Sequence, residues 1–171
     1  DHVVDISAGS SFSLAIRSDG SVVGWGRNDV YQLGLNEDTF GNGKTTDNPD
    51  TLNRYAPVYL ENGSGVLKAL EVSAGNEHAV ALTMDGTVKM WGRYWLYNYW
   101  YISGKYYYNK DVYQTYTEPV AVVDADGGIV DNVISVAASL NTDHALKADG
   151  TVWSWGSYVY GERGDGLYRG R

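Results

Sequence analysis

Hydrophobic and polar residues alternate along three stretches of the chain, and each stretch is interrupted by an Asp-Gly pair. The central stretch, residues 72–92, reads VSAGNEHAVALTMDGTVKMWG. Alternation with a period of two is typical of β-strands, and Asp-Gly between two such runs is a strong hairpin signal. The pattern predicts a short first strand, a second strand over 78–83 and a third that ends at Trp91-Gly92. The turn at Asp85-Gly86 is predicted to be type I′, with positive φ at both central residues.

The same pattern, called the repeat frame below, occurs twice more. Residues 6–26 read ISAGSSFSLAIRSDGSVVGWG, and residues 136–156 read VAASLNTDHALKADGTVWSWG. The turn glycines Gly20, Gly86 and Gly150 are 66 and then 64 residues apart. We expect positive φ at all three, at equivalent hairpin tips. A period of this size with several strands per copy predicts an all-β fold of the β-propeller type, with four-stranded blades.

Two Pro-Val segments, at 57–60 and 119–123, predict a fourth, outer strand, because proline is tolerated at the first position of a strand or on an edge. The predicted repeats are 1–56, 57–118 and 119–171, within a single domain. On this division the first sheet lacks its outer strand. About three blades is fewer than the roughly four to eight of closed propellers. We expect a fragment of a longer propeller or a ring completed by other copies, with self-association through open sheet edges.

Composition excludes several classes of function. The 171 residues include 13 basic and 21 acidic side chains, a net charge of −8, which argues against nucleic-acid binding. Cysteine is absent, so disulfides and thiol chemistry are excluded. No apolar run is long enough to predict a membrane span. Two Asp/Asn-rich segments, 36–50 and 124–127, lack the full ligand alternation of a calcium loop. We expect no metal, no cofactor and no catalytic residue.

The repeat frame resembles the repeat of the regulator-of-chromosome-condensation family. The second copy carries the pattern as Ala74-Gly75, His78, Ala81-Leu82, Asp85-Gly86, Val88 and Trp91-Gly92. The family's Asn-x-x-Gly-Gln-Leu-Gly tail remains in the first copy as Asn28, Gln32, Leu33 and Gly34, with Tyr31 in place of the first glycine. The third copy keeps Gly161, Gly164 and Gly166. The resemblance implies a β-propeller, and family members include nucleotide-exchange factors for small GTPases, chromatin binders and secreted bacterial proteins that grip an enzyme.

The frame residues are interpreted as structural. Trp25, Trp91 and Trp155 recur at one position, which predicts burial between adjacent sheets. The resemblance implies that His78 packs inside the fold and forms a hydrogen bond. In the third copy Thr142 stands where this histidine is expected.

The informative segment is 94–116, YWLYNYWYISGKYYYNKDVYQTY, with nine tyrosines and two tryptophans. It occupies the position of the Asn/Asp-rich segment of the first copy. Aromatic residues at every second position, followed by Ser103-Gly104-Lys105, predict a projecting hairpin with aromatic cross-strand pairs. Its rings either pack against the propeller or a neighbouring subunit, or form a binding surface. Tyrosine favours the second interpretation, because each hydroxyl requires water or a partner.

The sequence thus predicts a non-catalytic protein-binding module, with aromatic loops on one face of a propeller. The alternatives are a carbohydrate-binding propeller, a nucleotide-exchange factor for a small GTPase and a structural assembly subunit. We expect an unidentified protein partner, or a glycan, and a location outside the cell or at its surface. The predicted partner-binding residues are Tyr94, Trp95, Tyr97, Tyr99, Trp100, Tyr101, Tyr106, Tyr107, Tyr108, Tyr113, Tyr158, Tyr160, Asp29 and Tyr31.

Overall fold

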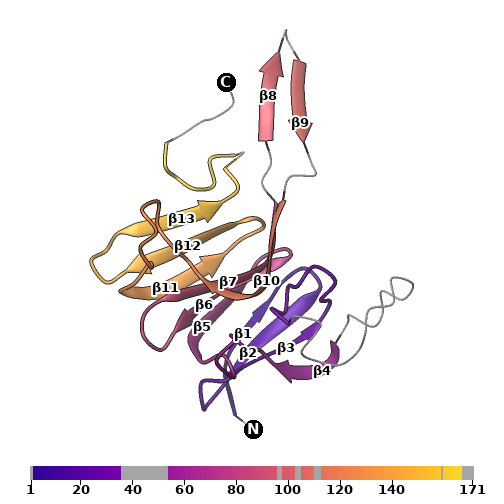
Figure 1. The fold of residues 1–171 in the computed structure, drawn as a ribbon, viewed down its shortest axis with the longest axis vertical. Helices are drawn as coiled ribbons and strands as arrows, with labels where there is room; N and C mark the ends of the chain where they lie inside the picture. Colours follow the sequence, from indigo (N-terminus) through magenta and orange to yellow (C-terminus); the bar gives the residue numbers. More distant parts are fainter. Residues whose placement is uncertain are drawn as a thin grey trace.

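The computed structural model describes residues 2–35, 54–95, 98–102, 105–109, 113–158 and 160–166. In these ranges the chain forms β-strands and no helix (Figure 1). The strands are β1 Val3–Ala8, β2 Phe12–Arg17, β3 Val22–Gly26, β4 Arg54–Tyr59, β5 Ala69–Ala74, β6 His78–Thr83, β7 Val88–Trp95, β8 Asn98–Ile102, β9 Lys105–Asn109, β10 Tyr113–Ala121, β11 Val133–Ala138, β12 Thr142–Lys147 and β13 Val152–Gly156.

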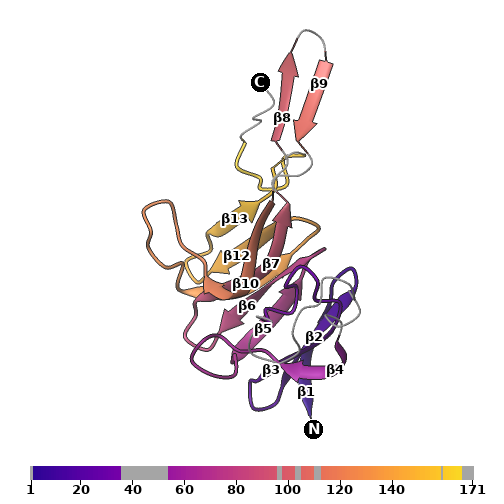
Figure 2. The same ribbon diagram turned by 45° about the vertical axis from the view of Figure 1, so that its right-hand side comes forward.

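Three antiparallel sheets lie side by side, and each is built from one repeat frame (Figures 1 and 2). Their strand orders are β1-β2-β3-β4, β10-β7-β6-β5 and β11-β12-β13. The inner strands β1, β5 and β11 contact one another in turn. A fourth, two-stranded sheet of β8 and β9 extends beyond the end of the second sheet (Figure 2). The fold is all-β and of the β-propeller type, with each large sheet forming one blade.

Each outer strand pairs with the repeat frame before it in the chain, whereas the sequence predicted pairing with the frame after it. β4 pairs with β3, through Val23 with Tyr59 and Gly24 with Val58, so the first sheet has four strands. β10 pairs with β7 in the same way. The prediction that the first sheet lacks its outer strand is therefore wrong, and the three-stranded sheet of the described residues is the third. The reason is geometric: β5 pairs with β6 on one edge and meets the neighbouring inner strands on the other, whereas the edge of β3 is free for β4.

The Asp-Gly turns form the hairpin tips, but their geometry is not type I′. Gly20, Gly86 and Gly150 have φ of 81°, 77° and 84°, which confirms the positive φ expected of them. The preceding aspartates do not share it. Each loop has three residues: in the first, the Gly20 amide donates to the Arg17 carbonyl at 2.8 Å and the Arg17 amide to the Ser21 carbonyl at 2.9 Å. One extra loop residue converts the expected two-residue turn into a type I turn closed by a left-handed glycine.

Alternate residues of β6 enter two different cores. Ala79 and Ala81 face the first sheet, whereas Val80 and Leu82 face the third. All six residues of β6 are buried. A strand with both faces covered is expected to be apolar on both, and β6 is so over residues 79–82. The second sheet is therefore the structural centre of the described chain.

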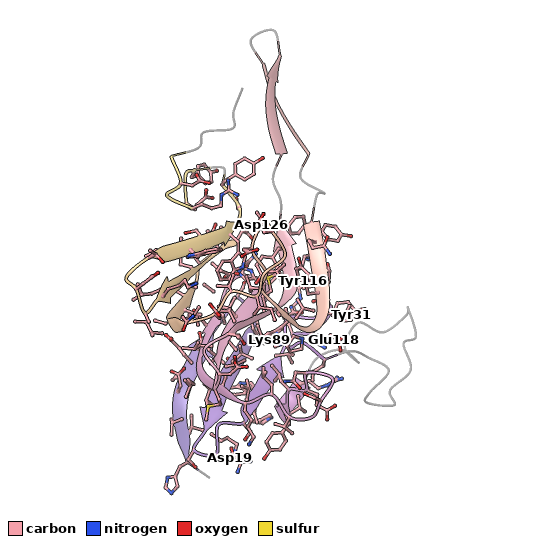
Figure 3. The ribbon with its side chains drawn as sticks, turned by 60° about the vertical axis from the view of Figure 1, so that its left-hand side comes forward. Asp19, Tyr31, Lys89, Tyr116, Glu118 and Asp126 are labelled. Carbon is pink, nitrogen blue, oxygen red and sulfur yellow. The ribbon has the colours of Figure 1, made fainter. Side chains whose placement is uncertain are left out.

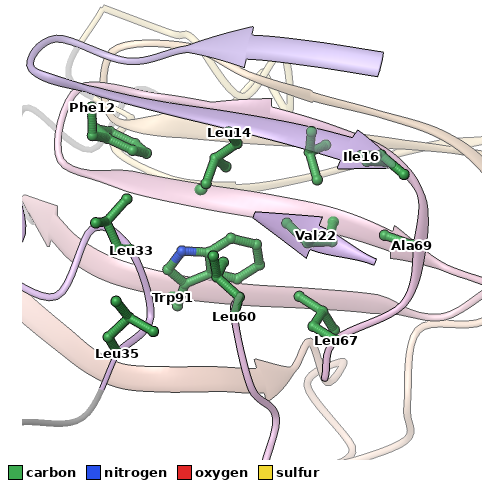
Figure 4. Packing of buried hydrophobic residues seen from close by; sticks show 13 residues of the cluster. Phe12, Leu14, Ile16, Val22, Leu33, Leu35, Leu60, Leu67, Ala69 and Trp91 are labelled. Carbon is green, nitrogen blue, oxygen red and sulfur yellow. The ribbon is translucent and has the colours of Figure 1, made fainter. Parts of the chain in front are cut away.

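Trp91 lies at the centre of the core between the first and second sheets. Its side chain is fully buried among Leu14, Leu33 and Leu60, and its indole Nε1 donates to the Gln32 carbonyl at 3.0 Å (Figure 4). The equivalent Trp25 and Trp155 are only half-buried. The burial predicted for the three tryptophans is thus complete at Trp91 alone, where the first loop covers the ring.

Side chains of one inner strand bind the backbone of the next. Asp5 and Ser7 of β1 accept hydrogen bonds from the amides of Val72 and Ala74 at 3.1 and 3.0 Å. One junction further, Glu71 and Ser73 accept in the same way from Val136 and Ala138, at 3.0 and 2.8 Å. These bonds pair inner-strand amides at each junction and fix the register between adjacent sheets.

A buried polar pair lies at the junction of the second and third sheets. His78 Nε2 is 2.9 Å from Asp143 Oδ1, and neither side chain is exposed. The packing and hydrogen bond expected for His78 are confirmed. The equivalent positions at the first junction are Phe12 and Ala79, both in the apolar core. Equivalent positions are thus occupied by an apolar pair at the first junction and by a polar pair at the second.

We predict that His78 and Asp143 are strongly coupled in stability. Asp143→Ala or His78→Ala alone should lower the free energy of unfolding by about 3–5 kcal/mol, because a buried polar group loses its partner. The double variant His78→Phe/Asp143→Ala, which copies the first junction, should stay within about 1 kcal/mol of the parent. Chemical denaturation of all four proteins measures this; additive losses in the double variant would contradict it.

Acid should destabilise the fold through the hairpin tips. Hydrogen bonds from Thr83 and Thr87 lower the pKa of Asp85, and those from Thr151 lower the pKa of Asp149. A carboxyl with a lowered folded-state pKa stabilises above its unfolded value, near 4, and this stabilisation is lost as the pH falls through the folded pKa. The free energy of unfolding should therefore fall below about pH 4, and less steeply in Asp85→Asn/Asp149→Asn.

Asp126→Asn is the matched control for the acid experiment. Its carboxylate is exposed, and no hydrogen bond to it is described within the ranges given above. Denaturation midpoints across the acid range should respond to pH as in the parent. An equal pH response in Asp85→Asn/Asp149→Asn and the parent would refute the assignment to the turns.

Candidate functional site

The candidate site is the end of the three sheets at which β3, β7 and β13 finish, called the loop face below. It is opposite the Asp-Gly tips, because each of these strands runs away from its tip. The loop after β3 is joined there to the turn between β5 and β6 by an ion pair, Arg27 Nη1 to Glu77 Oε1 at 3.5 Å. Figure 3 shows the side chains over the described body, with Asp19 labelled at the end opposite this face.

The loop after β3 is held by its own polar side chains. Asn28 Oδ1 accepts from the Leu33 amide at 2.9 Å, and Asn28 is itself buried. Gln32 Oε1 accepts from the Val30 amide at 3.0 Å. Leu33 and Leu35 then enter the core beside Trp91. A side chain on Gly34 would meet Trp91 and Pro119 of β10, so the loop lies closely against both.

Tyr31 has an unusual backbone conformation in this otherwise regular loop. Its φ is 64°, in the left-handed region. Gly161 is at the same position of the third loop, with φ of 78°. For a tyrosine this region costs about 1–2 kcal/mol, whereas glycine enters it freely. The first loop therefore carries a strain that the third loop does not.

Glu77 organises the boundary between the first and second loops. Its carboxylate is largely buried and accepts from Arg93 Nε at 2.9 Å and from the indole Nε1 of Trp95 at 2.6 Å. Arg93 Nη2 is also 2.9 Å from Glu77 Oε2, so the guanidinium binds it through two nitrogens. Arg27 reaches the other oxygen and also pairs with Asp29 at 2.6 Å. The hydrogen bond to Asp29 raises the pKa of Arg27.

Aromatic rings cover Arg93 at the base of the predicted hairpin. The guanidinium carbon lies 4.7 Å from the ring centroid of Trp95 and 5.4 Å from that of Tyr113. The two rings meet edge-on at 5.6 Å, as expected for residues paired directly across β7 and β10. Tyr113 is 51% exposed. Two of the predicted binding residues are thus brought together here.

The third loop presents two further tyrosines. Tyr160 is 87% exposed, and its amide donates to Glu162 at 2.7 Å. Tyr158 is half-buried beneath Arg163, whose guanidinium carbon is 4.8 Å from the ring centroid. Arg163 in turn pairs with Asp165 at 2.8 Å. Of the predicted residues, Tyr160 is the most exposed within the described ranges.

Tyr94 does not belong to the exposed surface, which corrects the prediction for this residue. Its ring is buried, 4.2 Å from the centroid of His78 and 5.9 Å from that of Tyr116. Burial and the nearby Asp143 carboxylate raise the pKa of the Tyr94 hydroxyl. Tyr94 occupies the position of Asn28 in the first loop, and such a position points into the fold.

Asp29 serves the loop itself. One carboxylate oxygen pairs with Arg27 and the other accepts from Gln32 at 3.3 Å.

Within 94–116, β8 and β9 pair in the register Tyr99 with Tyr108 and Trp100 with Tyr107. Tyr97 lies outside the described residues. The side chains of the other predicted hairpin residues lie outside the description as well: Tyr99, Trp100, Tyr101, Tyr106, Tyr107 and Tyr108.

The sequence interpretation missed Glu77, Arg27 and Arg93. A signal for them was present, because Arg27 and Arg93 both follow the frame glycine, at Gly26 and Gly92. A repeated arginine at a loop entrance predicts a common carboxylate partner. Glu77 carries no such repeat, since Ser11 and Asn141 stand in its place in the other copies.

Within the described ranges, no group of three or more His, Asp or Glu side chains is arranged to hold a metal ion. No helix there is long and apolar enough to cross a membrane. Asp124 accepts from the amides of Asp126 and Gly128 at 2.9 and 2.8 Å, which is the geometry of a turn. What the loop face offers chemically is aromatic area and paired charges.

Comparison with known families identifies the repeats. The model described as "Regulator of chromosome condensation (RCC1) repeat" matches residues 3–32, and a second model of the same description matches residues 19–82. The matches include the first frame, its loop and the first two strands of the second frame.

The similar proteins are longer than this chain. A Dictyostelium discoideum bifunctional serine/threonine-protein kinase/NEDD4-like E3 ubiquitin-protein ligase is 28% identical over 90% of this chain and 8% of its own length. Protein RCC1 of Candida albicans is 32% identical over 53% of this chain and 19% of its own. The structure of Prp20p from Saccharomyces cerevisiae, described with its binding properties to Gsp1p and histones, is 23% identical. It covers 99% of this chain and 36% of that one, with a TM-score of 0.58. This chain thus spans less than two thirds of each.

We predict that Glu77 is the most costly residue to remove from the loop face. Glu77→Ala should lower the free energy of unfolding by about 2–4 kcal/mol, because hydrogen bonds to a charged group contribute about 1.5–3 kcal/mol and two arginines lose their partner. The matched control is Asp165→Ala, which removes a more exposed ion pair with Arg163 and should cost less than about 1 kcal/mol. Equal losses in the two denaturation curves would show that Glu77 does not organise this face.

Proposed function

Because residues 3–82 match models of the regulator-of-chromosome-condensation repeat, we propose that this chain is a non-catalytic module that binds a protein partner through its loop face. One observation carries the proposal: exposed aromatic rings stand on this face, while the frame beneath it is buried. Tyr113 and Tyr160 are 51% and 87% exposed, whereas Trp91 and His78 are fully buried. Exposed tyrosines supply large contact area at low entropic cost.

The charges of the loop face support a neutral, apolar partner surface. Arg27, Arg93 and Arg163 each pair with a carboxylate of the same chain. A cation already paired with a carboxylate offers little to a phosphate or a nucleic acid. The net charge of −8 acts in the same direction at long range.

The hairpin of β8 and β9 is included in the proposal as an extension of this surface. Its base is fixed by the Glu77, Arg93 and Trp95 contacts. Exposure of the rings of Tyr97, Tyr99 and Trp100 stays a prediction, as does that of the other hairpin rings. Self-association through open sheet edges, glycan binding and a location at the cell surface likewise remain proposals.

Nucleotide exchange is the second candidate, favoured by the similarity to Prp20p, which is described with its binding to Gsp1p. The alternative predicts that the chain accelerates nucleotide release from Gsp1p. The binding-module proposal predicts no acceleration. Fluorescent-nucleotide release from purified Gsp1p, with and without the chain, separates the two.

The binding proposal is tested with a phage-displayed library of random dodecapeptides selected on the immobilised chain. Tyr113→Ala and Tyr160→Ala should each weaken the selected peptides by about tenfold or more, the usual size of an interface hot spot. Their melting temperatures should stay close to that of the parent, because both rings are exposed. The matched control is Tyr59→Ala, a tyrosine 42% exposed near the Asp-Gly tips, which should bind like the parent.

Equal weakening by Tyr59→Ala would place the binding surface elsewhere and contradict the proposal. Competition of the selected peptides by soluble glycans would favour the carbohydrate alternative. A chain that selects no peptide, and whose aromatic variants lose stability instead, would be a structural subunit.

A further inference from the structure

We infer that the outer edge of β13 binds an extended segment of another protein as the fourth strand of the third sheet, and that this segment has the form Pro-Val-Xaa-Leu or Pro-Val-Xaa-Val. This edge is separate from the loop face, so the inference goes beyond the proposed function and does not depend on it. Within the described residues, β13 is the last strand of its sheet and pairs with β12 alone (Figure 1).

The equivalent edges of the first and second sheets are both occupied. β4 pairs with β3, and β10 pairs with β7, each as an antiparallel outer strand. The two segments have related sequences, PVYL at 57–60 and PVAV at 119–122. In both, the valine after the proline lies at the same register, opposite Gly24 in the first sheet and opposite Met90 in the second. Ser154 is the equivalent residue of β13, because it pairs with β12 as Met90 pairs with β6.

The hydrogen bonds of the two outer strands define what the edge of β13 offers. The Leu60 amide donates to the Val22 carbonyl at 3.0 Å, and the Val122 amide donates to the Val88 carbonyl at 3.0 Å. Backbone groups alternate between the two neighbours of an antiparallel strand, so every second residue of β3 and β7 faces the outer strand. Val152 holds this position in β13. Its carbonyl, and the backbone groups of every second residue after it, therefore face the free edge.

Proline closes the outer edges of the first two sheets, and β13 contains none. Pro57 and Pro119 each precede the valine that pairs with the sheet, so the nitrogen without a hydrogen faces away from the sheet. A further strand cannot pair fully along such an edge. β13 reads VWSWG, with neither a proline nor a charged residue. Among the outer edges described, that of the third sheet is the one left open to a further strand.

The last residue of each segment indicates which side chain the edge accepts. Leu60 and Val122 are buried, and they lie in the same cores as Val22 and Val88. Val152 is equivalent to Val22 and Val88 but is 63% exposed. An apolar residue at the fourth position of a bound segment would lie beside Val152, as Leu60 lies beside Val22. The exposed valine therefore favours leucine or valine at this position.

The two Pro-Val segments of this sequence are already used. Each pairs with its own sheet and buries Leu60 or Val122 there. A second copy of the chain would lose that burial if it donated one of them. An extended segment of a different protein has no such cost. Addition of a strand to an open sheet edge is a common mode of peptide recognition, in which main-chain hydrogen bonds give affinity and alternate side chains give specificity.

The test uses a fluorescein-labelled peptide with the sequence of residues 114–123, QTYTEPVAVV, added to the whole chain. Fluorescence anisotropy should show saturable binding. N-methylation of the peptide at the amide of Val122 removes a donor to the sheet and should weaken binding by about tenfold or more. N-methylation at Ala121 is the matched control, because this amide faces away from the sheet. That peptide should bind like the unmodified one.

Variants of the chain locate the site. Val152→Lys should weaken binding of the peptide by about tenfold or more, because a charge replaces the apolar contact. It should melt like the parent, because Val152 is exposed. Ile134→Lys is the matched control: Ile134 is 57% exposed on β11, at the other edge of the same sheet, and its variant should bind like the parent. In NMR hydrogen exchange the peptide should slow the Ser154 amide and leave the Trp153 amide, which faces β12, unchanged.

Several results would overturn the inference. Without saturable binding to the parent, the edge is no peptide site, and equal weakening by the two N-methylated peptides would exclude strand pairing. A Ser154 amide already slow in the chain alone, together with a dimer in sedimentation velocity, would assign the edge to a second copy. Tyr113→Ala and Tyr160→Ala should bind this peptide as the parent does, and a loss in either would place the peptide on the loop face. Failure of strand addition would leave the loop-face proposal standing, because the two surfaces are tested by different variants.

Discussion

The second sheet of this chain depends on burial against both of its neighbours, because residues 79–82 of its strand β6 are apolar on both faces. β6 divides its residues between two cores, with Ala79 and Ala81 on one side and Val80 and Leu82 on the other. No single sheet can bury both faces by itself. In the third sheet, Leu146 and Val152 occupy the positions equivalent to Leu82 and Val88. They are 37% and 63% exposed, because no described sheet covers that face.

The two junctions satisfy this constraint with different chemistry. At the first, Trp91 is sealed by the loop after β3, whose Gln32 carbonyl accepts the indole hydrogen. At the second, the equivalent loop is replaced by the extension of β7, and the Trp155 indole has no hydrogen-bond partner within the described residues. Tyr94, His78 and Asp143 fill the space instead. Replacing the loop with a hairpin therefore coincides with a polar cluster in the core below it.

The sequence predicted the repeated hairpins well, because Asp-Gly turns and period-two alternation are local signals. The sequence assigned the Pro-Val strands to the wrong sheets. A Pro-Val strand can pair with the frame before or after it, and the pairing is determined by the free edge of β3. Tyr94 was grouped with its aromatic neighbours, although its place in the repeat, equivalent to Asn28, points inward. Glu77 was missed because its two arginine partners lie 50 and 16 residues away. Contacts of this kind depend on how two loops meet, which no local pattern encodes.

The same reasoning explains why the loops can carry function while the frame cannot. Frame residues such as Trp91 and His78 each have several buried neighbours, so a change there alters the packing of two sheets. Exposed residues past the frame glycine, such as Tyr113 and Tyr160, have fewer buried neighbours, and the three repeats differ in structure at this place. The chain has a strained tyrosine in the first loop, a hairpin in the second and an exposed Tyr160 in the third. A rigid, shared frame beneath three unlike loops is the physical arrangement from which a recognition surface is most easily made, because new side chains can be presented there without refolding the sheets that hold them.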